Sequence, residues 1–255
     1  MTATPAGITY ADYLKLDQLL SAQQPLSGLH DEMLFIVIHQ TKELWMKQML
    51  HELELAVSLV EADHFAAAYK ALARISRIQS VMTLSWDVLS TLTPVDYLAF
   101  RDVLGTSSGF QSAQFREFEF RLGLKNPDYL RHHAEGSEDR RRLERALERP
   151  SLRDASLAAL ERAGFDLGDR STAAIAVAWL EVYRDSERWF DLYQLAEKLV
   201  DLDDALAAWR HKHVLTVERI IGNKMGTGGS AGASYLRSTL DKRIFPELWA
   251  LRTDL

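Results

Sequence analysis

Residues 203–221 read DDALAAWRHKHVLTVERII, and this stretch decides the fold class. Its larger apolar side chains and one of its histidines recur at intervals of three and four residues, which is the spacing of one face of an α-helix. The positions on that face are Leu206, Trp209, His213, Thr216, Val217 and Ile220. Most charged side chains fall on other faces, so the stretch predicts a long helix packed against a core.

His213 is the chemically informative position of this helix, because it lies in the middle of the apolar face. His211 projects roughly 200° away from it at 3.6 residues per turn, so the two histidines cannot bind one metal ion together. If His213 binds iron, it does so as a lone axial ligand, and a neutral imidazole in an apolar surround suits haem. The alternative is a core histidine bonded to a neighbouring carbonyl. The helix alone leaves both open.

The composition restricts the class of protein. The chain has 255 residues, of which 47% are hydrophobic and only 6 are prolines, enough to bury a sizeable core in one domain. It has no cysteine, which excludes disulfides, thiolate-ligated haem and iron–sulfur clusters. The net charge is −6, with acids and bases interspersed, so we expect no nucleic-acid partner.

The N-terminus and the apolar runs predict where the protein resides. Residues 1–7 lack the basic and apolar regions of a signal peptide. No apolar run approaches the roughly 20 residues that span a bilayer. We therefore expect a cytoplasmic protein without a membrane partner.

Helical periods dominate the chain, and no stretch alternates like a β-strand. Capping residues and turns predict helices over about 10–21, 31–60, 65–92, 94–104, 111–122, 138–147, 151–163, 172–199, 203–221 and 245–251. Thr93 and Pro94 form one helix start, and Gly164 ends another helix. No repeat or linker divides the chain. We expect one all-α domain, residues 1–255, built on a bundle of long helices.

A second informative histidine lies in the segment DEMLFIVIHQTKELW, residues 31–45. Phe35 and His39 are four residues apart, so an aromatic ring and an imidazole share one helical face. This pair can line the pocket of a flat aromatic ligand. The alternative is a histidine at a helix–helix seam beside an ordinary core phenylalanine.

A third patch, DYLAFRDVLG, covers residues 96–105. Tyr97 and Arg101 are also four apart, so a phenol and a guanidinium can converge on one carboxylate. The alternative is an ordinary ion pair between Arg101 and a neighbouring acid.

The fourth patch is a loop dense in glycine, with 5 of the chain's 13 glycines between residues 222 and 232. This density indicates a backbone that other residues would not allow. The loop does not fit the Walker pattern of a phosphate loop. Its amides and the Thr227 hydroxyl can hold the polar end of a small zwitterion, and the loop can act as a lid. A mobile surface loop is the alternative.

Other metal sites have little support. A di-iron bundle needs paired Glu-x-x-His motifs on two helices, and only Glu61 to His64 has this spacing. His132 and His133 lie in the most polar stretch, residues 124–170, where we expect surface histidines.

Several segments in order carry a resemblance to a known family. They are TYADYL (9–14), HDEMLFI (30–36) followed by His39-Gln40 and Glu43-Leu44-Trp45, Phe100-Arg101 with SSGFQS (107–112), and GTGG (226–229). Together they resemble tryptophan 2,3-dioxygenase, a cytosolic haem enzyme, over nearly the whole chain. Two positions depart from the family's usual pattern: Leu29 precedes His30 where a doubled histidine is frequent, and Ala231 stands where serine is common.

The resemblance implies a haem-binding set and a catalytic histidine. His213 would be the proximal haem ligand, with Trp86 and Ser108 against or near the porphyrin. His39 would accept a hydrogen bond from the substrate indole N–H, and Phe35 would pack on the indole.

The resemblance also implies how the amino-acid end of L-tryptophan is bound. Arg101 would pair with the substrate carboxylate, assisted by Tyr97, and Thr227 would help hold this end as the loop closes. Tyr10 and Tyr13 match positions that reach into a neighbouring subunit's pocket, which implies a homotetramer with an exchanged N-terminal helix.

The implied reaction inserts both atoms of O2 across the C2–C3 bond of L-tryptophan and gives N-formylkynurenine. A haem monooxygenase relative that converts tryptophan or a methylated tryptophan to an oxindole would share these motifs. The residues themselves leave this alternative open, together with the question whether His39 acts as a base.

Overall fold

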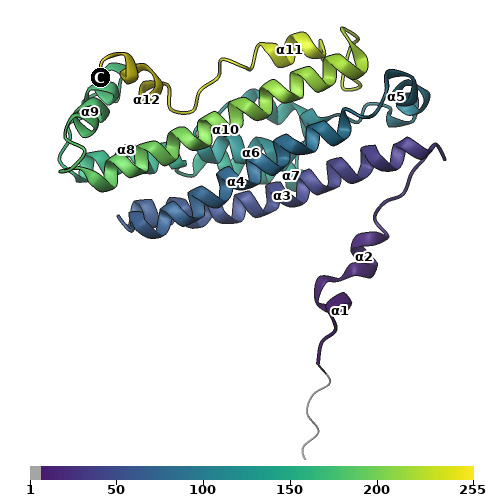
Figure 1. Ribbon diagram of the computed structural model, residues 1–255, viewed down its shortest axis with the longest axis horizontal. Helices are drawn as coiled ribbons and strands as arrows, with labels where there is room; N and C mark the ends of the chain where they lie inside the picture. Colours follow the sequence, from purple (N-terminus) through teal and green to yellow (C-terminus); the bar gives the residue numbers. More distant parts are fainter. Residues whose placement is uncertain (1–6) are drawn as a thin grey trace, which may run out of the picture.

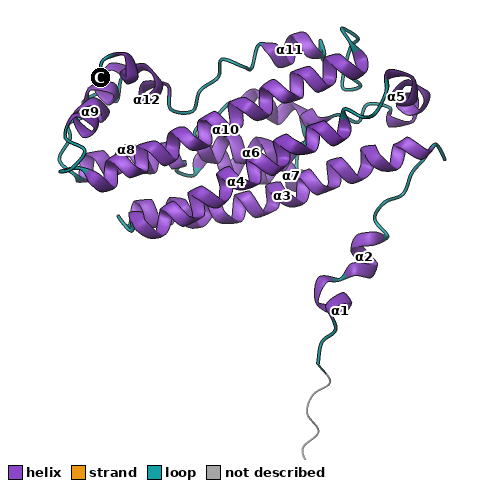
Figure 2. Cartoon of the chain, in the orientation of Figure 1, coloured by secondary structure: helices purple, strands orange, loops and turns teal. Residues whose placement is uncertain are grey.

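The computed structural model describes residues 7–255, and every regular element in this range is a helix (Figure 2). The expected all-α fold is confirmed. Residues 1–6, which carry most of the signal-peptide argument, lie outside the described residues. Within the described range, no helix combines the length and the apolar character needed to cross a membrane.

Three long helices form the body of the protein: α3 (His30–Glu61), α4 (Phe65–Leu89) and α10 (Phe190–Ile221). They run side by side, and α4 packs against both of the others (Figure 1). The shorter α-helices are α1 (Tyr10–Leu14), α2 (Leu16–Leu20), α5 (Pro94–Phe100), α6 (Ala113–Leu122), α7 (Glu138–Glu148), α8 (Leu152–Arg162), α9 (Thr172–Arg184), α11 (Ala233–Arg237) and α12 (Pro246–Ala250). Four 3₁₀ helices cover Arg101–Leu104, Gly109–Gln111, Pro127–His132 and Leu251–Thr253.

In residues 7–255 the buried apolar side chains form one large core and two smaller ones. The large core follows the three long helices and includes side chains from α6, α8, α9 and α12. One small core joins α6 to α7. The other small core lies where α3 begins and where α4 and α10 end, beside α5 (Figure 1). Its buried members are Ile38, Trp86, Leu89, Leu92, Tyr97, Phe100 and Ile220. This end of the bundle contains most of the residues that the sequence analysis selected.

Local capping explains where several helices begin and end. The Thr93 side chain accepts from the Asp96 backbone N–H, and α5 starts at Pro94 as predicted. Gly164 follows the C-terminus of α8 with a φ of +100°, a conformation that favours glycine. These boundaries were predictable because they depend on residues adjacent in the chain.

The predicted division into helices over 172–199 and 203–221 is wrong. The break lies at residues 185–189, and α10 continues unbroken through residues 200–203. Asp203 does not cap a helix. Its buried carboxylate accepts hydrogen bonds from the backbone N–H groups of Ile244 and Phe245 at 3.1 and 3.2 Å, and from the Trp249 indole N–H at 3.0 Å. Asp203, at which the sequence predicted a helix start, instead binds α10 to the segment before and within α12.

Three other boundaries also differ from the prediction. The helix expected over 10–21 is divided into α1 and α2 by Lys15, whose φ is +54° and ψ +43°. The helices expected over 65–92 and 94–104 end as α-helix at Leu89 and Phe100, and a 3₁₀ turn follows the second. The short helix α11 was not predicted.

The N-terminal arm, α1 and α2, extends away from the body (Figure 1). Neither helix has a buried residue, and the side chains of Tyr10 and Tyr13 are 76% and 72% exposed. The chain after the arm is held to α3, because the Gln40 side chain donates to the Ala22 carbonyl at 2.9 Å and Glu32 accepts from the Leu26 N–H at 2.8 Å. The start of α3 therefore sets the direction of the arm.

We expect Asp203→Asn to lower the free energy of unfolding by about 3 kcal/mol, because donors that now bond a buried carboxylate would face an amide that satisfies them poorly. Urea denaturation at pH 7 measures this. Asp201→Asn is the matched control, since Asp201 is exposed on the same helix and pairs with Lys198. Equal, small losses in both variants would contradict the structural role of Asp203.

Candidate active site

The His39 ring is half-buried on α3 with one nitrogen already engaged. Its Nδ1 lies 2.7 Å from the Phe35 carbonyl, to which it donates, so Nε2 remains free to accept a hydrogen bond. Burial lowers the pKa of His39 to about 4, against the opposing effect of the Phe35 bond and with a smaller contribution from Lys42. The imidazole is therefore neutral at pH 7, with its tautomer set by its own helix.

An aromatic wall adjoins this imidazole. The Phe35 ring lies 4.2 Å from the His39 ring and 5.9 and 5.7 Å from the rings of Tyr97 and Phe100, measured between centroids. Burial raises the pKa of the Tyr97 hydroxyl, and the charge of Arg101 partly offsets this effect. The wall joins α3 to α5, and with His39 it suits the edge and face of a flat aromatic molecule carrying an N–H group.

His213 on α10 lies within a second set of rings. Trp86 stacks on it at 4.4 Å with 9° between the planes, and Trp209 lies 5.2 Å away. Burial, with smaller contributions from nearby positive charges, lowers the pKa of His213 to about 3. Within residues 7–255 the ring has no hydrogen bond to a carbonyl, unlike His39. A neutral imidazole in this setting can act as a metal ligand.

Three buried hydrogen-bond donors close to His213 have no acceptor among the described residues. They are the Lys42 amino group and the indole N–H groups of Trp86 and Trp209. Lys42 is only 5% exposed, and its Nζ lies 2.8 Å from the centroid of a Trp86 ring. Burial lowers the pKa of Lys42 to about 6. Because buried donors are normally bonded, their gathering indicates a binding partner rich in acceptors.

These features fit a haem. Aromatic faces suit a flat macrocycle, a neutral histidine suits the axial position, and the unbonded donors suit propionate carboxylates. In the described part of the chain, no three His, Asp or Glu side chains gather to bind a metal ion directly. An iron ion at His213 would thus need most of its ligands from a macrocycle.

The sequence analysis did not select Lys42, although a signal was present. Lys42 follows His39 by three residues and therefore shares its helical face. A lysine on a helix is usually exposed, so nothing in the sequence indicated that this one is buried.

Arg101 lies at the start of the 3₁₀ helix after α5. Its guanidinium donates to the Met225 carbonyl in the glycine-dense loop, and in residues 7–255 it forms no ion pair with an acid. The alternative of an ordinary ion pair is thus not realised in this range. The remaining N–H groups can bind an incoming carboxylate.

The glycine-dense loop packs on the turn that follows Arg101. The Thr227 hydroxyl donates to the Ser107 carbonyl at 2.5 Å. A Cβ at Gly228 would lie 2.6 Å from the Ser108 Cβ, so only glycine permits this approach. Contacts with Ser107 and Ser108 thus hold the loop against the turn.

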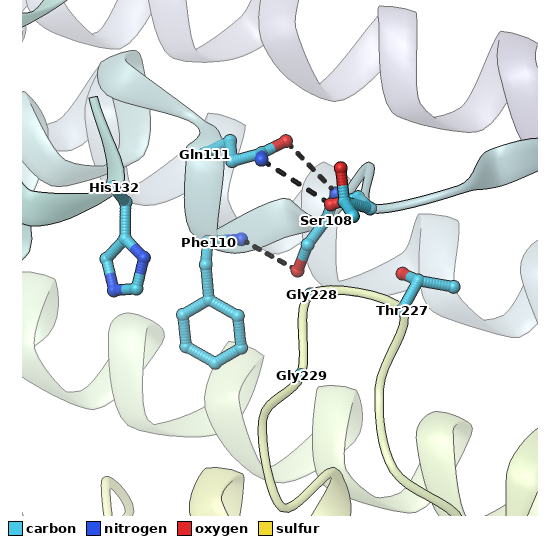
Figure 3. Close-up of a pocket in the computed structure, with 8 residues that line it drawn as sticks. Ser108, Phe110, Gln111, His132, Thr227, Gly228 and Gly229 are labelled. Atoms are coloured by element: carbon cyan, nitrogen blue, oxygen red, sulfur yellow. Dashed lines mark hydrogen bonds between the residues drawn. The ribbon is translucent and has the colours of Figure 1, made fainter. Parts of the chain in front are cut away.

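A pocket of about 300 Å³ lies between this loop and the turn. Ser108, Phe110 and His132 line one side of it and Thr227 the other (Figure 3). Ser108 and Thr227 are thereby brought together in a pocket whose lining includes neither His39 nor His213. The placement of His132 and His133 at the surface is wrong, because His132 is half-buried in this lining and His133 is buried. Tyr10 and Tyr13 join neither group and lie on the exposed arm.

The fold and these groups define the class: an all-helical protein whose long helices hold two neutral histidines beside aromatic rings that can accommodate flat molecules. The chain belongs to the tryptophan 2,3-dioxygenase family, whose pattern it matches over residues 1–168 and 167–255. A tryptophan 2,3-dioxygenase from Caulobacter vibrioides is 61% identical over 97% of this chain and 98% of its own length. Proteins of the same name from Bacillus thuringiensis subsp. konkukian and Polaromonas sp. are 52% and 53% identical, over 98% and 97% of this chain and 93% and 88% of their own lengths.

We expect His39 to make the stability of the haem-free protein sensitive to acid. Its pKa is about 4 in the folded state and about 6.5 when unfolded, so between these values the unfolded chain binds more protons. The free energy of unfolding then falls as the pH drops from about 6.5 to 4. Urea denaturation at pH 7 and pH 5 should show a smaller fall for His39→Phe than for the wild type.

The control for this experiment is His51→Gln, since His51 is exposed on the same helix. This variant should keep the wild-type pH dependence. If the free energy of unfolding fell equally in His39→Phe and the wild type, the His39 ring would have the same pKa in the folded and unfolded states, and the prediction would be wrong.

Proposed function

We propose that the protein is a haem-dependent tryptophan 2,3-dioxygenase, which inserts both atoms of O2 across the C2–C3 bond of L-tryptophan and yields N-formylkynurenine, a step of tryptophan breakdown along the kynurenine pathway. The observation that carries the proposal is the pair of neutral imidazoles, one with a free acceptor nitrogen beside an aromatic wall and one within an aromatic stack. Membership of the family supports the same activity.

His213 is the proposed axial ligand of haem b, with one haem per subunit. Trp86, which stacks on His213, would lie against the macrocycle, and Ser108 would lie near its edge. The haem supplies the activation of O2. The low pKa of His213 keeps its ring unprotonated and able to ligate at neutral pH.

Phe35 and His39 would position the indole. Phe35 offers its face to the ring, and His39 Nε2 accepts the indole N–H, because Nδ1 already donates to a carbonyl. Neutral His39 carries no proton on Nε2, so it gives none to the reacting oxygen atoms. An imidazole that withholds its proton at this position favours insertion of both oxygen atoms over loss of one as water.

Arg101 and Tyr97 would bind the substrate carboxylate, and Thr227 would hold the ammonium end. Arg101 and Thr227 now bond the carbonyls of Met225 and Ser107, across the contact between loop and turn. Arg101 would exchange the Met225 carbonyl for the substrate carboxylate as the loop closes, whereas the Thr227 oxygen can accept from the ammonium group while its hydroxyl still donates to Ser107.

The assembly proposed is a homotetramer in which the arm enters a neighbouring subunit's pocket with Tyr10 and Tyr13. The support is that α1 and α2 are five residues each and bury nothing on their own body. Such short helices are not stable in water alone, so the arm needs a partner surface. We propose a cytoplasmic location, with L-tryptophan and O2 as partners and neither nucleic acid nor a membrane.

Turnover of L-tryptophan under ¹⁸O2 by the reduced, haem-loaded protein tests the reaction. We expect mass spectrometry to show two labelled oxygen atoms in N-formylkynurenine, because both atoms of one O2 enter the product. An oxindole with a single labelled atom would instead identify a monooxygenase.

Replacing Arg101 tests the carboxylate site. Arg101→Ala should raise KM for L-tryptophan by about 10- to 150-fold, since a charge-assisted hydrogen bond contributes about 1.5–3 kcal/mol. Arg219→Ala is the control, because Arg219 is also bonded only to a backbone carbonyl, that of Ser90. An unchanged KM in the Arg101 variant would exclude the role.

A further inference from the structure

Lys42 is a buried lysine without a polar partner in the described chain. It lies on α3 one turn after His39 and is 5% exposed, with no hydrogen bond or ion pair to any of residues 7–255. Its Nζ lies over the aromatic face of Trp86, 2.8 Å from the ring centroid. The lowered pKa of Lys42 means that its amine is mostly neutral at pH 7 without an anionic partner, because an aromatic face recovers only part of what burial costs the protonated form.

The carboxylates on the surrounding helices are already engaged by other residues. Glu43 accepts from Ser112 and Gln114, Glu119 from Arg116 and Arg210, and Asp87 pairs with Lys212. The closest other titratable groups, His39 and His213, are neutral at pH 7. In the described range, no carboxylate forms an ion pair or a hydrogen bond with Lys42.

We propose that Lys42 anchors the haem through an ion pair between its ammonium group and a propionate carboxylate. This inference rests on the proposed function, which places haem at His213. The amine contacts Trp86, and Trp86 stacks on His213, so Lys42 belongs to the cofactor's surroundings. The substrate carboxylate is assigned to Arg101, which leaves the propionates as the anions available to Lys42.

The first test compares Lys42→Met with Lys47→Met, a control on an exposed lysine of the same helix. Methionine is an unbranched chain one atom shorter than lysine, and it removes the charge. Without haem, Lys42→Met should resist urea better than the wild type, because a buried amine becomes an apolar chain. When hemin is titrated into the haem-free protein, the Kd of Lys42→Met for hemin should be about tenfold or more above that of the wild type. Lys47→Met should change neither quantity.

Hemin dimethyl ester, in which both propionates are methylated, shows whether the carboxylate is responsible. The wild type should bind hemin more tightly than the ester, and the ratio of the two Kd values should be about tenfold smaller in Lys42→Met. Lys42→Arg, which keeps the charge, should retain most of it. Circular dichroism verifies folding, and Lys42→Gln repeats the comparison if the methionine variant does not fold.

An unchanged preference in the neutral variants overturns the ion pair. If Kd for L-tryptophan rises instead, the partner of Lys42 is the substrate carboxylate and the proposal is likewise overturned. His213→Ala distinguishes failure of the proposed function from failure of the Lys42 ion pair. If that variant kept the wild-type hemin affinity and visible spectrum, His213 would not be the haem ligand, and the proposed function would be refuted. Loss of hemin binding there, with an unchanged preference in Lys42→Met, would refute the Lys42 pairing alone.

Discussion

Burial that keeps two imidazoles neutral is the constraint on which the site depends. His39 and His213 lie on different long helices, and desolvation is the main cause of the low pKa of each. A protonated His213 could not ligate a metal, and a protonated His39 could not accept a hydrogen bond at Nε2. The packing of α3 and α10 along α4 is therefore also what sets the chemistry of the two rings.

The second constraint is the close contact between the glycine-dense loop and the turn before α6. Gly228 approaches Ser108 more closely than any other residue could, and Arg101 and Thr227 both bond backbone carbonyls across the same seam. Of the side chains proposed for the amino-acid end, Arg101 is thus held by a neutral carbonyl that a carboxylate can replace, and the Thr227 oxygen remains able to accept a hydrogen bond. A loop held in this way can respond to the substrate without unfolding the core.

The sequence predicted those features that depend on near neighbours in the chain. The inward face of α10, the start of α5 at Pro94 and the Phe35–His39 pair follow from helical spacing and capping. Features set by distant contacts could not be predicted. The sequence placed a helix start at Asp203, and its true role could not be seen because its hydrogen-bond partners lie some forty residues later in the chain. The burial of His132 and His133 likewise depends on how a polar segment folds back onto the protein.

The donors around His213 show how such a site differs from an ordinary core. Lys42, Trp86 and Trp209 place three donors in apolar surroundings without an acceptor from the described chain. Apolar side chains of similar volume would make the haem-free protein more stable. A chain that keeps the donors gains instead when an anionic partner binds, because that partner satisfies groups left unbonded in its absence. Binding and folding would then be linked: the free energy that these donors cost the protein alone would be recovered as affinity for the proposed haem.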